Sequence, residues 1–515
     1  MTEQATKPTS ETILSSSPTS SAPPPLPSPS LQQEQNSNLD RSTSRFGGGS
    51  GSSQSGSVGV RKRATIIDEP DLEKGVGVTK DSEKRAKVVE KDVSDARLGL
   101  GGPFAGPPRR ATMESRTTMR RSFTSLFQPE HRLKDPPNFL VSIKNLLLGS
   151  VFNVLLVFIP ISWALHFAID NDIAVFVTSF LAIMPLATIL SQATEELSLR
   201  VGETIGGLIN ASLGNAVELI VAIVSLFNCE LIIVQTSLLG SILSNLLLVL
   251  GMCFFAGGIK VKEQEFLATP AQLNTSLLMM SVISLVIPSA FHLVLGDIPD
   301  ATERPDILKI SRGVSILLLL IYFGFLYFSL FSHKELFEDE GGEEEEEEPQ
   351  MNMMSVVVTL VVVTVLIGVT SEWLVTAIDG VSQRGVSKTW LGLILIPIAS
   401  NSTEHIAAVI FSWKNKIQMA VSIAIGSSIQ IALFVIPLLV TIGWMADKPL
   451  SMLFDPYATV LLFLSVLIVN FVIADSRSNW LEGFVLMMVY LVVALTVWFV
   501  PDSLSDQLFP DSLCT

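Results

Sequence analysis

Two short segments of this chain place an asparagine and a glutamate three residues apart within otherwise apolar sequence. The first, Ser-Leu-Gly-Asn-Ala-Val-Glu, contains Asn215 and Glu218, and the second, Ile-Ala-Ser-Asn-Ser-Thr-Glu, contains Asn401 and Glu404. Residues three apart share one face of a helix, so each segment presents an amide and a carboxylate together. Carboxylate and amide oxygens are ligands that a hard cation such as calcium prefers. The two segments therefore predict a cation site with these four residues as its ligands.

Both glutamates lie where a charge is costly. An ionised side chain at the centre of a membrane helix costs about 2.5–3.5 kcal/mol on insertion scales, so it usually faces a partner or a transport pathway. Two carboxylates carry charge that either one divalent cation or two protons can neutralise. Calcium and protons are therefore expected to compete for Glu218 and Glu404, which predicts exchange of one for the other. His405 is either a proton relay, because histidine titrates near about pH 6.5, or a polar group hydrogen-bonded beside the cavity.

Other polar residues near these segments have two interpretations each. Ser244 and Gln430 lie in neighbouring apolar stretches, where they either face the site or join helices through hydrogen bonds. Glu195, Glu196 and Glu372 lie at the ends of apolar stretches, where a solvated charge is the ordinary expectation. The alternative for these three carboxylates is a role at an ion entrance.

The elements that carry these residues must be membrane-spanning helices. A helix needs about 20 mainly apolar residues to cross the hydrocarbon core. Hydrophobic residues make up 48% of the 515, and polar or Pro/Gly interruptions divide the chain after residue 145 into stretches of that length. Eleven transmembrane helices are predicted, near 148–168, 173–194, 204–228, 231–256, 270–293, 312–332, 353–378, 390–412, 416–441, 455–474 and 482–500. The fold class is therefore an all-α membrane protein.

The two motifs are copies of one another. The asparagines and the glutamates are each 186 positions apart (401 − 215 and 404 − 218), as are Gly240 and Gly426 in the similar segments Gly-Ser-Ile-Leu-Ser and Gly-Ser-Ser-Ile-Gln. The chain is predicted to contain one extra helix, 148–168, and two five-helix repeats, 173–332 and 353–500. Because five is odd, the copies enter the membrane from opposite sides, and such inverted repeats place substrate sites near the midplane.

The polar stretches lie outside the predicted spans. Residues 1–135 are rich in Ser, Thr, Pro and Gly and are predicted to be a disordered tail. Residues 333–352 form an acidic linker, which makes much of the net charge of −15 local, and residues 501–515 form a short tail. Basic residues gather before the first span, which predicts a cytosolic N-terminus, a cytosolic linker and a luminal C-terminus. We prefer this orientation signal to binding of nucleic acid or anionic lipid.

Other function classes find little support. The sequence contains no His-Glu-x-x-His, no Gly-x-Ser-x-Gly and no phosphate-binding loop, so no enzymatic activity and no cofactor are predicted. A channel would use similar oxygen ligands, but inverted repeats with matched carboxylates suit alternating access better. Among exchangers, a sodium/calcium exchanger is the main alternative.

The segments around these motifs resemble the two signature repeats of the cation/proton exchanger family of the calcium/cation antiporter superfamily. The resemblance covers residues 140 to 500 and is carried by Thr194-Glu195-Glu196-Leu197, Gly206-Gly207-Leu208, Gly214-Asn215-Ala216-Val217-Glu218-Leu219 and Asn401-Ser402-Thr403-Glu404-His405. It is strongest to the vacuolar calcium/proton exchangers. It implies a multi-pass protein of the vacuolar membrane whose partners are calcium ions, protons and the lipid bilayer, with manganese as an alternative cargo.

The same resemblance implies roles for particular residues. Glu218 and Glu404 would be the central carboxylates that bind either metal or protons, with the two asparagines beside them. The acidic linker resembles a cytosolic acidic helix that the family has between its repeats. One departure is visible, because the family's second repeat usually reads Gly-Asn-Ala where this chain has Ser400-Asn401-Ser402. The substitution keeps the Asn and the Glu, so it bears on backbone geometry and ion preference more than on activity.

Overall fold

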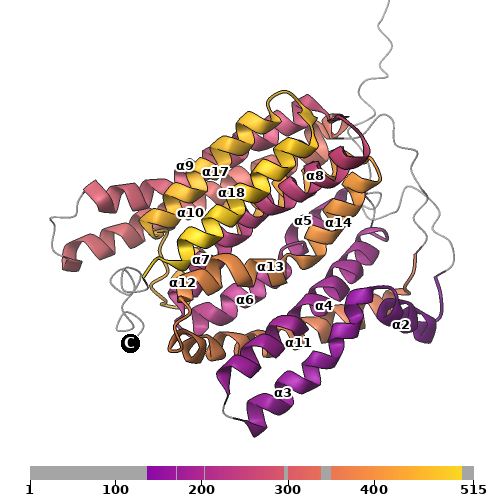
Figure 1. The fold of residues 1–515 in the computed structure, drawn as a ribbon, viewed down its shortest axis with the longest axis horizontal. Coiled ribbons are helices and arrows are strands. Elements are labelled where there is room, and N and C mark those ends of the chain that lie inside the picture. The colour runs from indigo at the N-terminus through magenta and orange to yellow at the C-terminus, as the bar shows by residue number, and fades with distance from the viewer. Residues whose placement is uncertain (1–135, 170, 202, 295–299, 338–348, 502–515) are drawn as a thin grey trace, which may run out of the picture. The chain divides into compact units, whose positions relative to one another are not determined.

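The described part of the chain is nearly all helical (Figure 1). The computed structural model describes residues 136–169, 171–201, 203–294, 300–337 and 349–501, all of which belong to one compact unit, Arg109–Thr515. The predicted tail at 1–135, residues 338–348 of the acidic linker and residues 502–515 of the C-terminal tail lie outside the described residues.

The helices follow one another with short connections. The first half contains α2 (Phe139–Leu148), the 3-10 helix η2 (Val151–Val157), α3 (Phe158–Ala168), α4 (Asp172–Ser198), α5 (Glu203–Leu213), α6 (Ala216–Phe227), α7 (Leu231–Leu243), the π-helical segment η3 (Ser244–Val249), α8 (Leu250–Lys260), α9 (Ala268–Val294), α10 (Asp300–Tyr327), the π-helical η4 (Phe328–Ser332) and the 3-10 helix η5 (Lys334–Leu336).

The second half has a similar order. It contains α11 (Met353–Ser382), α12 (Lys388–Trp390), the π-helical η6 (Leu391–Leu395), α13 (Ile396–Ser400), α14 (Ser402–Trp413), α15 (Ile417–Gln430), the π-helical η7 (Ile431–Val435), α16 (Ile436–Met445), α17 (Pro456–Ile473) and α18 (Trp480–Trp498). Two short strands, β1 (Gln264–Glu265) and β2 (Arg477–Ser478), pair antiparallel between the connections.

Among the described residues, nine helices are long and apolar enough to cross a membrane. Two further pairs of helices pass the same test together but are bent, by 41° at the junction of α5 and α6 and by 59° at that of α13 and α14. The protein therefore has nine to eleven candidate spans. Each overlaps one predicted stretch. However, α4, α8, α11 and α16 continue past the predicted ends, to Ser198, Lys260, Ser382 and Met445, and α10 begins at Asp300, well before the predicted residue 312.

Polar side chains fix where several spans begin. The side chain of Asn171 accepts a hydrogen bond from the backbone of Ala174, and that of Asn352 accepts one from the backbone of Ser355. Such caps satisfy amide groups that the first helical turn leaves without partners. They define the starts of α4 and α11, the two long helices that pack most extensively on each other.

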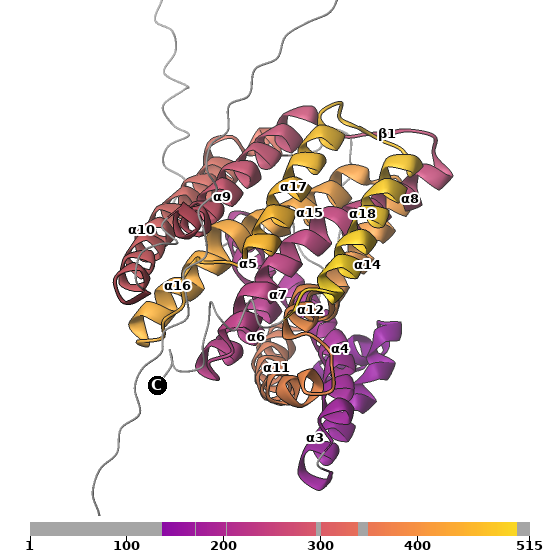
Figure 2. The same ribbon diagram turned by 60° about the vertical axis from the view of Figure 1, so that its left-hand side comes forward.

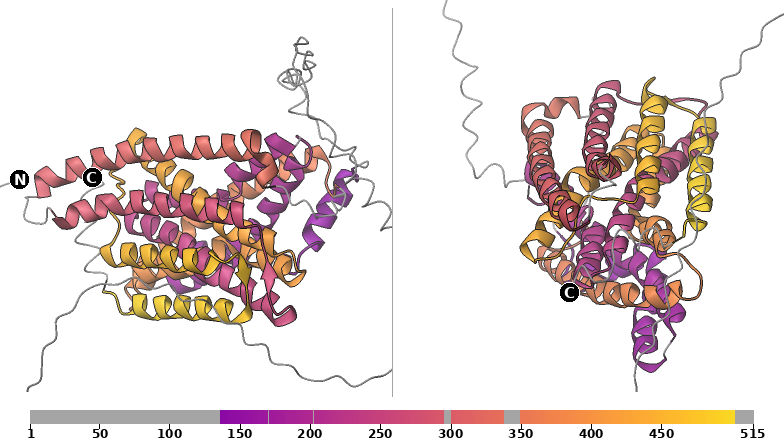
Figure 3. Two further views of the ribbon diagram at one scale, coloured as in Figure 1. Left: turned by 90° about the horizontal axis from the view of Figure 1, so that it is seen from above. Right: turned by 90° about the vertical axis from the view of Figure 1, so that its left-hand side faces the viewer.

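The buried apolar residues form two clusters, and each draws helices from both halves of the chain. One cluster is built around α4 and α11, with side chains from α6 and α13, and Figure 1 shows these helices close together with α3 beside them. The other contains most of the remaining spans. In it α9 packs against α17, α10 against α16 and α8 against α18 (Figures 2 and 3). Neither half therefore has a core of its own.

Candidate cation site

The two Asn/Glu motifs lie at the two helix breaks. Asn215 is the residue that precedes α6, and Asn401 is the residue that precedes α14; their backbones have similar angles, with φ −100° and ψ 31° at the first and φ −90° and ψ 9° at the second. Glu218 and Glu404 follow in the first turns of these helices. At each break the carbonyl end of a helix, α5 or α13, directly precedes the helix that carries the glutamate, and the last carbonyls of a helix have no partners within it.

The first motif is tied to α15 by side-chain hydrogen bonds. The amide nitrogen of Asn215 donates to Oε1 of Gln430 over 2.6 Å, and its Oδ1 accepts from Oγ of Ser427 over 2.9 Å. The same Ser427 hydroxyl lies 3.1 Å from Oε2 of Glu404, and Asn245 donates to it over 3.1 Å. One serine thus joins residues of both motifs.

The two carboxylates interact although they lie far apart in the chain. Glu218 is buried and Glu404 is partly buried. The two carboxylates are close enough for an electrostatic interaction. Two like charges so placed repel each other when both are ionised, and a bound cation or proton relieves that repulsion. The geometry therefore favours a positively charged occupant.

Several buried polar atoms at the breaks and on η3 find no hydrogen-bond partner among the described residues. They are Oε1 of Glu218, both side-chain polar atoms of Asn401, Oγ of Ser402, Nε2 of His405 and Oδ1 of Asn245. Buried polar groups are nearly always satisfied, so such a concentration indicates a position for water or an ion. Most of these atoms are oxygens, which suits a hard cation.

The ligand set is made of two carboxylates with amides and hydroxyls. Within the described ranges, no three His, Cys, Asp or Glu side chains come together as a metal cluster. Calcium often completes its six to eight oxygen ligands with backbone carbonyls and water.

Of the neighbouring residues named from the sequence, Gln430 contacts the first motif directly and Ser244 does not. The Ser244 hydroxyl donates instead to the carbonyl of Ser241, within its own helix. His405 lies buried one residue after Glu404. The first turn of α14 also reaches α4, where the hydroxyls of Thr403 and Thr188 are 3.1 Å apart.

The three outlying glutamates lie away from the breaks. Glu196 forms an ion pair with Arg200 over 3.2 Å and accepts a 2.6 Å hydrogen bond from the backbone of Gln350. Arg200 also donates to the carbonyl of Met351. Hydrogen bonds therefore connect the end of α4 to the residues that precede α11. Glu195 and Glu372 are exposed on α4 and α11.

Two contributors, Ser427 and Asn245, were not singled out from the sequence. Ser427 lies in the Gly-Ser-Ser-Ile-Gln segment that matches Gly-Ser-Ile-Leu-Ser in the other repeat, so its position in the duplication was a usable signal. Asn245 directly follows that other segment and has Ile431 as its counterpart 186 positions later (431 − 245). Because the pair does not match, the repeat gave no indication of Asn245.

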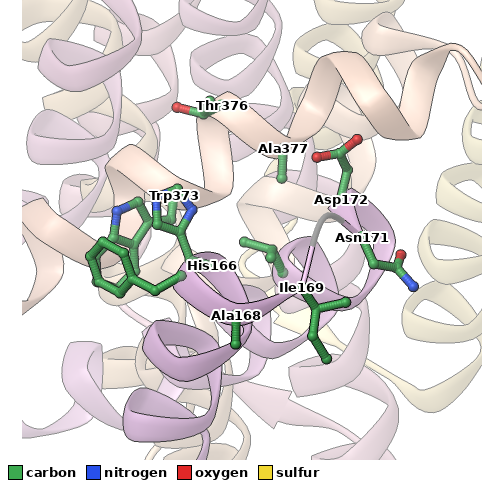
Figure 4. A pocket seen from close by; sticks show the side chains of 10 residues that line it. His166, Ala168, Ile169, Asn171, Asp172, Trp373, Thr376 and Ala377 are labelled. Carbon is green, nitrogen blue, oxygen red and sulfur yellow. The ribbon is translucent and has the colours of Figure 1, made fainter.

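A separate cavity of about 390 Å³ lies between α3, α4 and α11 (Figure 4). His166 and Trp373 stack at one side of it, with ring centroids 4.9 Å apart, and Asp172 lies across from them. It is lined by none of the motif residues. It is therefore distinct from the carboxylate pair.

Comparison with known proteins gives consistent matches. The family model described as sodium/calcium exchanger protein matches residues 171–331 and 355–499. A vacuolar calcium ion transporter of Cryptococcus neoformans var. grubii is 42% identical, with 76% of this chain and 80% of the relative covered. Vacuolar cation/proton exchanger 3 of Oryza sativa subsp. japonica is 39% identical over 72% of this chain and 90% of the relative.

A solved structure agrees with these relatives. The crystal structure of the selenium-substituted Ca²⁺/H⁺ antiporter protein YfkE is 32% identical, covers 68% of this chain and 99% of its own, and superposes with a TM-score of 0.58. The resemblance seen in the motifs is thus confirmed over most of the helical region. Because the family model matches more than half of the residues, the chain belongs to the sodium/calcium exchanger protein family.

Proposed function

We propose that this protein is a secondary active antiporter that moves calcium out of the cytosol, across the vacuolar membrane, in exchange for protons. The observation that carries the proposal is the meeting of Glu218 and Glu404 at two bent spans, in a network that joins both motifs. The names of its relatives, a vacuolar calcium ion transporter and a vacuolar cation/proton exchanger, agree. This role is transport and not an enzymatic reaction, and it requires no cofactor.

Charge balance explains the coupling. One calcium ion or two protons neutralise the carboxylate pair, and either occupant leaves a site that costs little to carry through an apolar barrier. An empty, doubly ionised site would cost about 2.5–3.5 kcal/mol for each charge on insertion scales. The loaded site therefore reorients readily and the empty one does so rarely, which makes the movement an exchange.

Ser427 supports a link between the proton and the calcium ligands. Its hydroxyl has one hydrogen, and both Oδ1 of Asn215 and Oε2 of Glu404 lie within reach. When Glu404 is ionised, the hydroxyl donates to the carboxylate. When Glu404 carries a proton, the carboxyl group donates to Ser427 and the hydroxyl turns to Asn215. Protonation thus occupies an oxygen that calcium would otherwise use.

The proposed layout is eleven spans, with α3 in the extra span and two inverted repeats over 173–332 and 353–500. Recurrence of a bent span followed by a helix with a π-helical segment, η3 or η7, supports the duplication. Several contacts between connections agree with the crossings. Lys260 at the end of α8 donates to the carbonyl of Trp413 at the end of α14, and eleven crossings put both ends on the cytosolic side.

The strand pair also supports the proposed layout. The connection after α8 carries β1 and the connection after α17 carries β2, and the layout assigns both to the cytosol. The proposed orientation has the N-terminus and the 333–352 linker in the cytosol and the 501–515 tail in the lumen.

The test is calcium uptake by proteoliposomes that contain the purified full-length chain. An imposed pH gradient, acidic inside, should drive calcium inward, and added calcium should release protons. The same vesicles with a sodium gradient in place of the pH gradient test the alternative of sodium/calcium exchange. Uptake driven by sodium alone would overturn the proposal, and competition by Mn²⁺ would measure how far the site accepts manganese.

A further inference from the structure

Residues 186 positions apart should have similar surroundings if both repeats were packed in the same way, but one matched pair of helix contacts differs sharply. In the second repeat's bent span, the first half (α12, η6 and α13) packs along α7. Its counterpart in the first repeat, α5, packs against α4 and η4. The helix that corresponds to α7 is α15. The packing partners of the two half-spans are therefore not equivalent.

The contact on α7 is closed. A methyl group added at Gly240 would overlap the carbonyl oxygen of Leu393 and lie 2.7 Å from Cγ of Pro397. One added at Gly392 would overlap Oγ1 of Thr236. Glycine is required at both positions because backbone and side chain approach each other there without space for a Cβ atom.

The matching face of α15 is open. Gly426, the counterpart of Gly240, has no atom within 4 Å of an added methyl group. Met419 is 48% exposed, whereas its counterpart Ile233 on α7 is 0% exposed. Ser422 is exposed, whereas its counterpart Thr236 is buried.

The half-span α5 shows the same difference. Leu208 is 40% exposed, and its counterpart Ile394 is 4% exposed. Asn210 on the same helix is an exposed polar residue, and it lies within the predicted span 204–228. Polar groups in membrane spans usually face protein or a water-filled cavity, so exposure of Asn210 together with Ser422 of α15 indicates an aqueous pathway.

We infer that the structure is open toward the side of the membrane on which α5 begins. In the opposite conformation, α5 packs against α15 and occupies the space that is left by the missing side chain of Gly426. The positions that correspond to Leu393 and Pro397 are Gly207 and Ala211, both small enough for such an approach. With the proposed orientation, the open side is the cytosolic one. This inference rests on the proposed antiport and adds the residues that limit its two conformations.

The test compares bulky and small substitutions at the two matched glycines in the full-length chain. Gly426→Leu fills open space here but blocks the closed contact of α5, so this variant should bind calcium as the unsubstituted protein does. Its exchange rate should fall by about tenfold or more, because overpacking a closed contact is strongly unfavourable. Gly324→Leu on α10 is the control, since an added methyl group there also meets open space; its exchange rate should stay within about twofold of the unsubstituted rate.

Labelling reports which conformation is populated. Asn210→Cys lies on the exposed part of α5 and should react with a membrane-impermeant maleimide applied from the open side. Gly426→Leu should maintain or increase this reaction. Gly240→Ala creates an overlap in the present conformation, so it should shift the population the other way and slow the reaction.

The inference is supported if Gly240→Ala slows the labelling while Gly426→Leu leaves it unchanged or faster. Rapid exchange by Gly426→Leu, or shifts in the same direction for both glycines, would overturn it. If Gly240→Ala does not fold, the exchange rate and labelling of Gly426→Leu decide alone. If the unsubstituted chain exchanges no calcium for protons, the proposed function fails, while the labelling shifts still test the conformational inference.

Discussion

The side-chain amide of Asn215 donates a 2.6 Å hydrogen bond to Oε1 of Gln430, which joins the break before α6 to the end of α15. The counterpart of Gln430 in the first repeat is Ser244, whose hydroxyl bonds within its own helix. The two motifs, although similar in sequence, are therefore held differently. Asn215 has two partners, while both polar atoms of Asn401 have none among the described residues.

This difference leads to a first prediction. Gln430→Ala removes the partner of a buried amide, and leaving such a group unsatisfied costs about 1–3 kcal/mol. We expect the calcium concentration for half-maximal uptake to rise by roughly tenfold. Ser244→Ala is the matched control and should have a much smaller effect. Equal effects of the two variants would contradict a special role for the Asn215–Gln430 bond.

The second prediction concerns the carboxylates. Glu218→Gln and Glu404→Gln keep the size of the side chain, but each removes one negative charge. The site of either variant would therefore carry a net positive charge when calcium is bound. We expect calcium affinity to fall by roughly 10–100-fold, as for the loss of a hydrogen bond or contact to a charged group, and proton-driven uptake to disappear. Binding by calorimetry and uptake in vesicles measure the two effects. A Glu218→Gln protein that still accumulated calcium against a proton gradient would exclude this assignment.

Ser427 provides a third prediction. Ser427→Ala removes the hydroxyl shared by Asn215 and Glu404, and each bond to a charged group contributes about 1.5–3 kcal/mol. We expect weaker calcium binding and less proton release for each calcium ion taken up. Ser427→Thr keeps the hydroxyl and should restore both. Proton release per calcium ion, followed with a pH dye, distinguishes this role from a simple packing defect.

The fourth prediction separates two roles for Glu196. The carboxylate is largely buried against Arg200 and the backbone before α11, and breaking a buried ion pair by removing one partner costs about 3–5 kcal/mol. Glu196→Ala should therefore lower the Tm of the purified protein with little change in calcium affinity. The exposed Glu195→Ala is the control and should leave Tm nearly unchanged. A loss of affinity at unchanged Tm would instead favour the ion entrance.

The sequence predicted the positions of the spans and the meeting of the two motifs, because each depends on a strong local signal. Apolar stretches long enough to cross a membrane are a clear signal in a sequence. A carboxylate within such a stretch is energetically costly and therefore indicates a functional site. The shared offset then paired Glu218 with Glu404 across the chain. The same offset relates Gln430 to Ser244, and both were named as residues that could face the site. Only Gln430 contacts a motif residue.

The contacts that break the repeat could not be predicted in this way. Asn245 bonds to Ser427, but its counterpart is an isoleucine, so a comparison of the repeats hides it. From the sequence, Glu196 was expected to be a solvated charge at the end of a span, because the backbone of Gln350, which it binds in addition to Arg200, lies 154 positions away. The conformation was also beyond the sequence, since both repeats carry the same glycines and only packing shows which contact is closed.

The packing of α18 against α8 and of α17 against α9 has a consequence for how the protein is made. Of the described spans, α17 and α18 are synthesised last. Until then, the surfaces of α9 and α8 that pack against them have no protein partner. A nascent chain that ends before α17 cannot complete the larger cluster, however well its early helices insert. The larger cluster can therefore be completed only after α17 and α18 have been synthesised and inserted.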